Sequence, residues 1–428
     1  MKIHIKNGRL IDPASKTDRP LDVFIAAGRI VGVGDAPAGF EPNSVLDATD
    51  CIVCPGLIDL SARLREPGFE YKATLESEMA AAAAGGVTRL ACPPDTDPVL
   101  DEPGLVEMLS HRARLPEFAH VHPVGALTRQ LAGKELTEMA ELTEAGCVAF
   151  GQANQAIVDT QVLLRAMMYA ATFGFPVWLQ AQDPFLAKKG VAHDGEVAAR
   201  LGLAGIPVAA ETIAIATLLH LVRETGVRLH LRRLSSAAGL EMIIAARAAG
   251  IDVSCEVTIN HLHLTDQSIG FFDAHARIEP PLRGTRDRDA LRAGLASGAI
   301  DALISDHTPV DDDAKQMPFE EAEAGATGLE LLLPLTLKWA REMQLPLVTA
   351  LARVTSDPAR ILGVKAGRLT QGAAADICVF DPAADFVVSR ENLRSQGKNT
   401  PFLGMVFPGR VRYTLIDGHM AFDGSLAW

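Results

Sequence analysis

Polar side chains follow a series of short apolar runs in the central part of the sequence, where strands are expected to end. A catalytic zinc ion needs at least three ligands from histidine, cysteine or carboxylate side chains. Amides bind transition metals weakly, and an arginine guanidinium stays protonated and does not bind them at all. Only Asp306, His307 and Glu256 are candidate ligands, so the sequence argues against metal-assisted hydrolysis. The polar residues at the expected strand ends are Ser61, Arg63, Asp95, Gln152, Gln180, Gln182, Arg232, Arg233, Glu256, Asp306 and His307.

Three other motifs carry little catalytic signal. Ser61 lies in no GxSxG elbow, so we interpret it as a filler residue rather than a nucleophile. His261 and His263 have the HxH spacing on a segment expected to be extended, but no carboxylate or cysteine completes a metal site, which favours loop histidines. Cys51 and Cys54 form a CxxC without a second pair, which is typical of ordinary strand residues here.

Two further segments are assigned structural roles. The HVH at 120–122 begins a predicted strand, and the amino ends of barrel strands serve stability rather than catalysis. The acidic run DDDAKQMPFEEAE at 311–323 is predicted to be either a lid over the site or a solvated loop.

Alternating strand and helix patterns fill the middle of the chain and must position these side chains. Eight β-α repeats over about 300 residues predict a (β/α)₈ barrel, in which chemistry takes place at the carboxyl ends of the strands. Both ends of the chain read as short strands joined by turns, so we expect them to build one small β-sandwich together. We assign 1–53 and 363–428 to the sandwich and 54–362 to the barrel. The predicted barrel strands lie in 56–64, 86–94, 120–127, 146–152, 176–182, 227–234, 251–258 and 299–307.

Arginine is the prominent cation at these strand ends. The first and eighth strands of a closed barrel are neighbours, so Arg63 and Asp306 can meet. A buried carboxylate without a cation is costly, and a planar guanidinium can neutralise it with two hydrogen bonds. We therefore hypothesise that arginine replaces a metal cation as the charge partner of Asp306. The alternative is that the arginines point into solvent and pair with nothing in particular.

Length, composition and net charge indicate how many domains, which partners and which cellular compartment to expect. The chain has 428 residues, of which 48% are apolar and 22% charged, so one large folded domain and a smaller one are expected. A net charge of −13 disfavours nucleic acid and anionic membranes as partners. The N-terminus lacks the apolar core of a signal peptide, and no stretch is long enough to cross a bilayer. Six scattered cysteines fit a reducing compartment, which predicts a cytoplasmic protein.

As a set, the motifs along the chain resemble the dihydroorotases of the amidohydrolase superfamily, in the form found as separate bacterial chains. The similarity runs nearly end to end, and no single motif would be convincing alone. The motifs include PGLIDL, LREPG, GGVTRLACPPDTDPVLD, GCVAF, CEVTINHLHLT, IDALISDHTP, SDPARILGV, GAAADICVFDP and NTPFLGMVFPGRVRYTLIDGHM.

The resemblance implies a two-zinc site at the mouth of a TIM-type barrel, which opens the ring amide of dihydroorotate or closes carbamoyl aspartate in reverse. Only the aspartate of the eighth strand, ligand and proton shuttle in active members, survives here, as Asp306. We therefore expect no bound metal, with zinc only under the alternative of an active enzyme. The other ligand positions of the family hold Ser61, Arg63, Gln152 (or its neighbour Ala153), Gln180 and Arg233.

The substrate pocket implied by the resemblance is altered too. The arginine that would hold the substrate carboxylate remains as Arg65, whereas two asparagine positions hold Asp95 and Glu279, and a histidine position holds Val310. Two carboxylates a few ångströms from a substrate anion would repel it, and this repulsion would cost on the order of several kcal/mol of binding free energy at an effective dielectric near 20. Substrate binding is therefore expected to be impaired.

Three functions remain open at this point. The resemblance implies, first, a non-catalytic subunit of pyrimidine synthesis, assembled with aspartate carbamoyltransferase and paired as a homodimer within a larger complex. A second hypothesis is an active dihydroorotase or other cyclic amidohydrolase, with one metal or none, built around Asp306 and His307. The third is a module that holds an anionic metabolite without transforming it, through Arg63, Arg65, Arg232 and Arg233.

Overall fold

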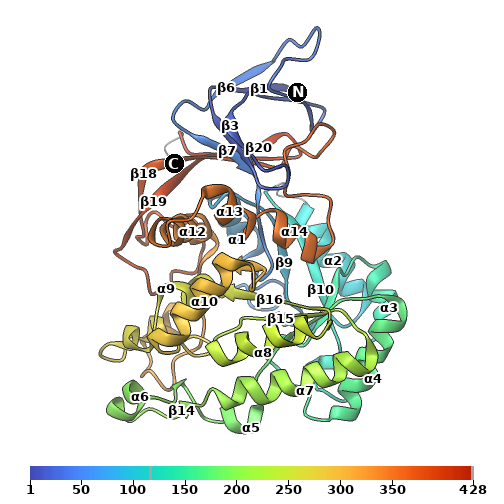
Figure 1. Ribbon diagram of the computed structural model, residues 1–428, viewed down its shortest axis with the longest axis vertical. Coiled ribbons are helices and arrows are strands. Elements are labelled where there is room, and N and C mark those ends of the chain that lie inside the picture. Colours follow the sequence, from blue (N-terminus) through green and yellow to red (C-terminus); the bar gives the residue numbers. More distant parts are fainter. Residues whose placement is uncertain (115–117, 426–428) are drawn as a thin grey trace.

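The computed structural model describes residues 1–114 and 118–425. Residues 115–117 lie outside it, as do 426–428, the last three of the predicted C-terminal sandwich segment. Figure 1 shows a small β part, built from the blue N-terminal and red C-terminal strands, above a larger α/β part. The predicted borders at 53/54 and 362/363 stay a prediction, and strand β7 (Ile52–Pro55) spans the first of them.

Eight parallel strands form the central sheet of the larger part, counted over the described residues. They follow the eight apolar runs in chain order, and helices lie between them. The predicted (β/α)₈ barrel is therefore confirmed, with the two-layer β part beside it. The strands are β8 (Leu57–Asp59), β9 (Val87–Cys92), β10 (His120–Ala126), β11 (Ala149–Gly151), β12 (Val177–Gln180), β15 (Leu229–Arg232), β16 (Val253–Thr258) and β17 (Ala302–Ile304).

The ring closes between its first and eighth strands just beyond their carboxyl ends. Ala62 and His307 form an isolated parallel bridge. The backbone N–H of His307 donates to Ser61 O at 3.2 Å, and the N–H of Arg63 donates to His307 O at 2.9 Å. This closure places the residues that follow β8 beside those that follow β17.

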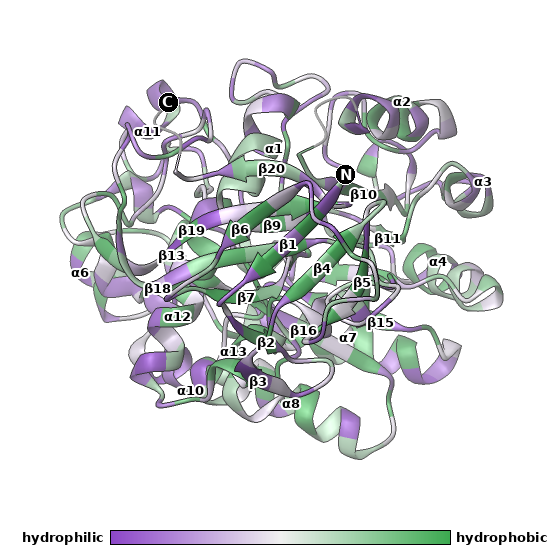
Figure 2. Ribbon diagram, turned by 90° about the horizontal axis from the view of Figure 1, so that it is seen from above, coloured by the Kyte–Doolittle hydropathy of each residue, from purple (hydrophilic) through white to green (hydrophobic). Residues whose placement is uncertain are grey.

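Helices surround the barrel, as the view from above shows (Figure 2). Their ends follow local capping rules: in α4, the Asp159 side chain accepts from Gln161 N, and Gly174 ends the helix at a φ of 71°. The longer helices are α1 (Leu75–Ala84), α2 (Pro103–Arg114), α4 (Thr160–Phe173), α7 (Ala209–Thr225), α8 (Ala237–Ala248), α10 (Thr285–Ser297) and α12 (Leu332–Glu342). The shorter ones are α3 (Met139–Glu144), α5 (Pro184–Ala187), α6 (Glu196–Leu201), α9 (Ile259–His263), α11 (Asp312–Gln316), α13 (Leu347–Ala352) and α14 (Ser356–Leu362).

The β part consists of two sheets that combine strands from both ends of the chain, as predicted. Their strand orders are β5-β4-β1-β6 and β20-β19-β18-β7-β2-β3. Alternation in β1 buries Ile3 and Ile5 against an apolar cluster that the two sheets share. The other strands of these two sheets are β1 (Lys2–Lys6), β2 (Arg9–Asp12), β3 (Thr17–Pro20), β4 (Val23–Ala26), β5 (Arg29–Val33), β6 (Ser44–Asp47), β18 (Ile377–Val387), β19 (Val406–Ile416) and β20 (His419–Asp423). A separate pair consists of β13 (Ala192–His193) and β14 (Gly205–Ile206).

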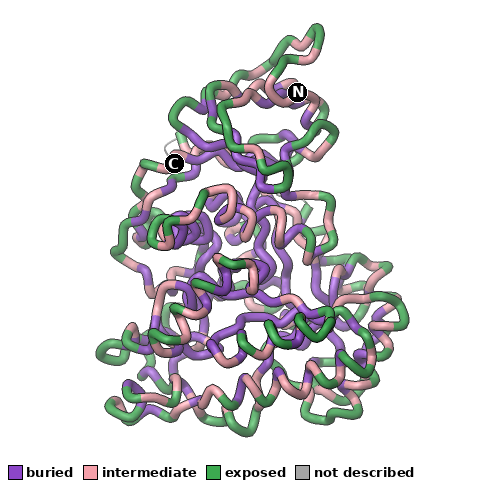
Figure 3. The backbone as a smooth tube through the Cα atoms, in the orientation of Figure 1, coloured by how far each residue is buried: buried purple, intermediate pink, exposed green. Residues whose placement is uncertain are grey.

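Burial is continuous through the barrel strands and the inner faces of the helices (Figure 3). Trp178 on β12 and Trp339 on α12 are among the largest fully buried side chains. Because of this burial, the barrel is a packed scaffold whose strand ends are held in fixed positions. No described helix is long and apolar enough to cross a membrane.

Two local predictions need correction or detail. His261 and His263 lie in the short helix α9 rather than on an extended segment, because the Thr258 side chain accepts from His261 N and caps a helical turn. The segment 311–323 contains a further short helix, α11, whose Lys315 is buried and donates to Ala274 O at 3.0 Å.

Candidate functional site

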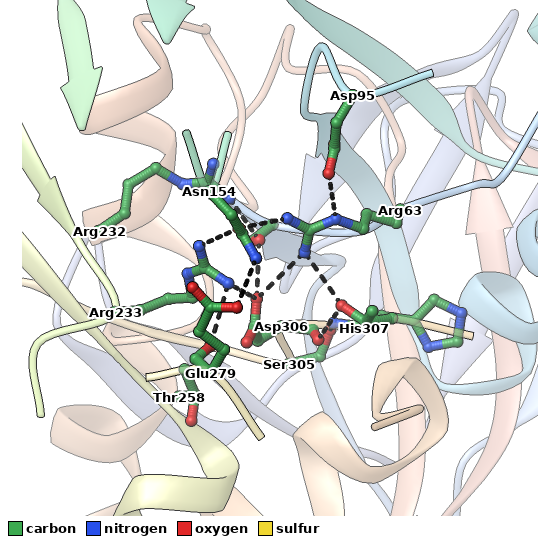
Figure 4. A network of polar contacts seen from close by, with 12 residues as sticks. Arg63, Asp95, Asn154, Arg232, Arg233, Thr258, Glu279, Ser305, Asp306 and His307 are labelled. Atoms are coloured by element: carbon green, nitrogen blue, oxygen red, sulfur yellow. Dashed lines mark hydrogen bonds and ion pairs between the residues drawn. The ribbon is translucent and has the colours of Figure 1, made fainter. Parts of the chain in front are cut away.

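Asp306, just past the end of β17, lies buried at the mouth of the barrel and faces two arginines. Arg63 Nη1 is 3.8 Å and Arg233 Nη1 is 3.7 Å from Asp306 Oδ1, and all three side chains are at most 5% exposed. Figure 4 shows both guanidinium groups turned toward this carboxylate. Arg233 and Asp306 also adopt positive φ values of 54° and 51°, a backbone conformation that costs about 1–3 kcal/mol each.

Asn154 joins the two guanidinium groups. Its Oδ1 accepts hydrogen bonds from Arg63 Nη2 at 2.8 Å and from Arg233 Nη2 at 2.5 Å. Arg233 Nη2 also donates to Gln180 Oε1. The sequence reasoning missed Asn154, since it lies three residues beyond β11, where the strand no longer fixes a side chain's direction.

Two of the three altered substrate-pocket positions, Asp95 and Glu279, also contact this cluster. Arg63 Nε donates to Asp95 Oδ2 at 2.7 Å. The Glu279 carboxylate accepts from Gln182 Nε2 at 3.2 Å and from Asn154 Nδ2 at 3.4 Å, and its backbone oxygen accepts from Arg233 Nη1 at 3.1 Å. We call the following six residues the mouth network: Arg63, Asp95, Asn154, Arg233, Glu279 and Asp306.

Burial and charge act in opposite directions on the groups of the mouth network. Burial raises the pKa of Asp306 above its usual value, and the positive charges of Arg233 and Arg63 oppose that rise. Burial lowers the pKa of Arg63, but Asp95 and Asp306 outweigh it and leave the pKa above normal. For Asp95, burial raises the pKa, but Arg63 outweighs it and the pKa is lowered. Arg63 and Asp95 therefore form a charged pair.

A third arginine reaches Asp306 through a serine. Arg232 Nη2 donates to Ser61 Oγ at 2.5 Å, and Ser61 Oγ donates to Asp306 Oδ1 at 3.3 Å. The Arg232 Nε atom lies 3.7 Å from Glu256 Oε1 inside the barrel. Ser61 is thus a hydrogen-bond link between a cation and an anion, which fits its interpretation as a non-nucleophile.

His307 is turned away from the mouth network, although it follows Asp306 directly (Figure 4). Its Nδ1 accepts from the backbone N–H of Gly328 at 3.1 Å, so the proton lies on Nε2, which donates to Glu78 Oε2 at 2.5 Å. Both ring nitrogens are occupied and the side chain is fully buried. The hypothesis that Asp306 and His307 together form the site is therefore wrong for His307, whereas Asp306 does lie at the mouth.

Two other predicted site residues lie outside the mouth network. Gln152 Nε2 donates to Thr128 Oγ1 at 2.7 Å and to Leu131 O at 3.0 Å, on the neighbouring strand-end loop. Arg65 Nε donates to Pro309 O at 2.8 Å, and Arg65 Nη2 lies 3.8 Å from Glu323 Oε1.

The side chains at the six positions that the dihydroorotase resemblance implies as ligands do not fit a zinc pair. They offer one carboxylate, one hydroxyl, two amides and two guanidinium groups, and the guanidinium groups lie beside the carboxylate. A divalent ion 4 Å from a guanidinium would be repelled by about 8 kcal/mol at an effective dielectric of 20. Only the Asp306 carboxylate is a suitable zinc ligand, and zinc sites need at least three. These positions are Ser61, Arg63, Gln152, Gln180, Arg233 and Asp306.

Comparisons with known proteins agree with this architecture. Residues 50–238 match the family described as Dihydro-orotase-like. The Dihydroorotase-like protein of Pseudomonas aeruginosa is 46% identical over 424 residues, which cover 99% of this chain and 100% of that protein. The Dihydroorotase of Geotalea daltonii is 40% identical over 421 residues and 98% of each chain.

Among solved structures, the L-hydantoinase (dihydropyrimidinase) of Arthrobacter aurescens has the same fold, with a TM-score of 0.88 and 25% sequence identity. The match covers 98% of this chain and 96% of the hydantoinase. With near-complete coverage at 46% identity and a shared barrel, the chain belongs to the dihydroorotase family of the amidohydrolase superfamily.

Proposed function

We propose that this chain is a catalytically inactive dihydroorotase-like subunit of pyrimidine synthesis, which supports a complex with aspartate carbamoyltransferase. One observation carries the first half of the proposal: Arg63 and Arg233 pack against Asp306, the one remaining ligand position. A guanidinium neutralises the carboxylate without activating water, whereas a metal ion can lower the pKa of bound water enough to make hydroxide. The arginines supply the charge but not the nucleophile.

The substrate half of the site supports the same proposal. Arg65, the position implied to hold the substrate carboxylate, donates to Pro309 O and lies near Glu323 instead. Asp95 and Glu279 add negative charge at the mouth, and each accepts hydrogen bonds from protein side chains. A dianionic substrate such as carbamoyl aspartate would have to break these pairs and face both carboxylates.

The assembly half of the proposal rests on the family. The full barrel and sandwich are retained around a mouth that is closed by internal ion pairs, which favours a structural role over a catalytic one. We propose that the chain forms a homodimer within the larger complex, because closed two-fold pairing is the commonest symmetry. A cytoplasmic location belongs to this proposal, supported by six cysteines that are all free and buried.

The experiment is to express the chain with and without the aspartate carbamoyltransferase of the same organism. We expect co-purification, a complex larger than the transferase alone by light scattering, and a change in transferase activity when this chain is omitted. A transferase of unchanged size and activity without the chain would refute the assembly role.

A carbamoyl aspartate cyclisation assay on the zinc-supplemented protein tests the inactive half separately. We expect no turnover above that of the Asp306→Asn variant, whereas zinc-dependent turnover lost in this variant would establish the active alternative. A thermal-shift screen with carbamoyl aspartate, dihydroorotate and phosphate tests the binding-module alternative, since a ligand of the native state raises the Tm.

A further inference from the structure

Three potential metal ligands meet where the barrel joins the sandwich, at the opposite end of β10 from the mouth. His120 begins β10, Asp376 directly precedes β18, and Asp417 lies in the turn between β19 and β20. One ligand atom from each lies within 4.8 Å of the other two. The seven residues of β10 separate this cluster from the mouth by about 20 Å, at about 3.3 Å a residue.

The spacing of these atoms matches the edges of a zinc coordination tetrahedron. His120 Nε2 lies 3.3 Å from Asp417 Oδ2 and 3.7 Å from Asp376 Oδ1. Ligands that bind zinc at about 2.0–2.2 Å in tetrahedral geometry stand about 3.3–3.6 Å apart. The distance from His120 to Asp417 therefore lies in this range already, and the distance from His120 to Asp376, at 3.7 Å, exceeds it by about 0.1 Å. We propose that His120, Asp376 and Asp417 bind a divalent transition metal ion of the zinc class.

The polar atoms at the cluster leave room for such an ion. His120 Nε2 is buried and makes no well-aligned hydrogen bond. Asp376 divides its two oxygens: Oδ2 accepts from Arg89 Nε and Nη2 at 3.0 and 2.7 Å, whereas Oδ1 faces the imidazole and accepts the backbone N–H of Asp417 at 2.9 Å. Arg89 offsets one of the two carboxylate charges. Burial lowers the pKa of His120, but its contacts with Asp376 and Asp417 outweigh burial and raise the pKa to about 9, so a bound ion would take the place of the proton on Nε2.

A hollow of about 620 Å³ gives access to the cluster from solvent. His120, His122, Asp417 and His419 all line it. His122 lies on the same face of β10 as His120, and its Nε2 is likewise buried without a hydrogen-bond partner. Water would complete the coordination shell. The hollow contains one cation from the neighbouring helix α2, Arg114.

The ion would connect one barrel strand to two segments of the sandwich. It therefore acts as a structural link between the two parts of the fold and has no share in the chemistry of the mouth. This inference is independent of the proposed function. It changes how a metal analysis of the protein is interpreted, because zinc found in the purified chain would belong to the amino end of the barrel.

The test is to strip the protein with a chelator and titrate it with zinc chloride by calorimetry and with cobalt(II) by visible absorption. We expect one ion per chain, a tetrahedral cobalt spectrum, and a Tm raised by about 2 °C or more at saturation. Asp417→Asn keeps the backbone contact but should weaken binding at least about 10-fold, and His120→Ala should abolish it. His220→Ala, which removes an exposed histidine on α7, should bind as the wild type does.

Circular dichroism of each variant separates lost binding from lost folding, and Asp417→Asn is the conservative variant if His120→Ala is unstable. The inference is overturned if the stripped protein binds no zinc, or if both variants bind it as tightly as the wild type. Binding that survives in both variants but is lost in Asp306→Asn would place the ion at the mouth. That result would overturn the proposed function as well, whereas binding lost only in the His120 and Asp417 variants leaves it intact.

Discussion

Arg63 Nη1 stands 3.8 Å from Asp306 Oδ1 across the junction of the first and eighth strands, and both side chains are 5% exposed. The arginine holds a second carboxylate, Asp95, with its Nε at 2.7 Å. Arg233 approaches Asp306 from the sixth strand. The stability of the barrel mouth therefore depends on charges that neutralise one another out of water.

Replacing Asp306 by asparagine tests this dependence. The variant keeps the shape of the side chain but leaves Arg63 and Arg233 without their shared carboxylate. We expect a loss of about 3 kcal/mol or more in the free energy of unfolding, the usual cost of removing one partner of a buried ion pair. Urea unfolding with an unchanged m-value measures it. Glu107→Gln, on the exposed face of α2, is the control and should change stability by less than about 0.5 kcal/mol.

The second prediction concerns the coupling between Arg233 and Asp306. The double variant Arg233→Met and Asp306→Asn should lose less stability than the two single variants added together, by about 1–3 kcal/mol. The reason is that each single variant leaves the other member of this pair buried without its partner, whereas the double variant removes both members. A double-mutant cycle in urea measures the difference. Strict additivity would mean that the 3.7 Å approach of the two groups carries no energy.

Asn154 is predicted to stabilise the mouth through its side-chain oxygen. Asn154→Ala removes the acceptor for one N–H group each of Arg63 and Arg233, at an expected cost of about 1–3 kcal/mol. Gln155→Ala is the matched control, because this neighbour is also exposed and its side chain makes no hydrogen bond with the described residues. Equal stability of the two variants would contradict the prediction.

Glu330 should make the protein less stable as the pH rises from about 4.5 to about 7. Burial raises its pKa to about 7 against the opposing backbone N–H groups of Arg394 and Ser395, while an unfolded glutamate titrates near 4.5. Between these two values the folded state binds more protons than the unfolded state, so stability falls with rising pH, by on the order of 3 kcal/mol.

Urea midpoints measured from pH 4.5 to pH 8 on the wild type and Glu330→Gln check this sign. The glutamine variant stays neutral, so its stability should fall less over this window. A steeper or equal fall in the variant would show that Glu330 does not titrate there. Glu107→Gln serves again as the control, since its profile should follow that of the wild type.

The last prediction concerns restoring metal ligands at the mouth. In a His120→Ala background, the substitutions Ser61→His and Arg63→His alone should give no zinc binding, because Arg233 remains beside Asp306. Adding Gln180→His and Arg233→His removes that charge and gives four imidazoles and one carboxylate. Only this larger variant should hold zinc after gel filtration, as measured by mass spectrometry of the metal content. Zinc in the smaller variant would show that Arg233 does not exclude the ion.

The fold could be predicted from the sequence because each barrel strand is a buried apolar run between helix patterns. All eight runs correspond to strands of the ring within the described residues. The contact between Arg63 and Asp306 followed from ring closure alone. The dihydroorotase resemblance implied which positions hold the ligands of the family, and that assignment, which periodicity does not reveal, stays a prediction.

The parts of the site that could not be predicted lie where regular structure ends. Successive strand residues point to opposite faces, and this alternation was the available sign that His307 would not share the mouth with Asp306. Asn154 lies beyond the end of β11, and Thr258, the last residue of β16, caps α9, which begins at the next residue. Such turns depend on contacts between distant segments, such as that of Asn154 with Arg233, which sequence periodicity does not encode.

The short junction between β8 and β17 has a consequence for how the ring unfolds. A single bridge, made by two backbone hydrogen bonds, joins the outermost strands, while each of the other neighbouring strand pairs of the ring has two to four paired residues. Protease cleavage and amide exchange under mild denaturant should therefore begin along this seam. Replacing Arg63 by a residue that cannot make its contacts should then lower the barrier to opening the junction between β8 and β17. The rest of the sheet should be unaltered.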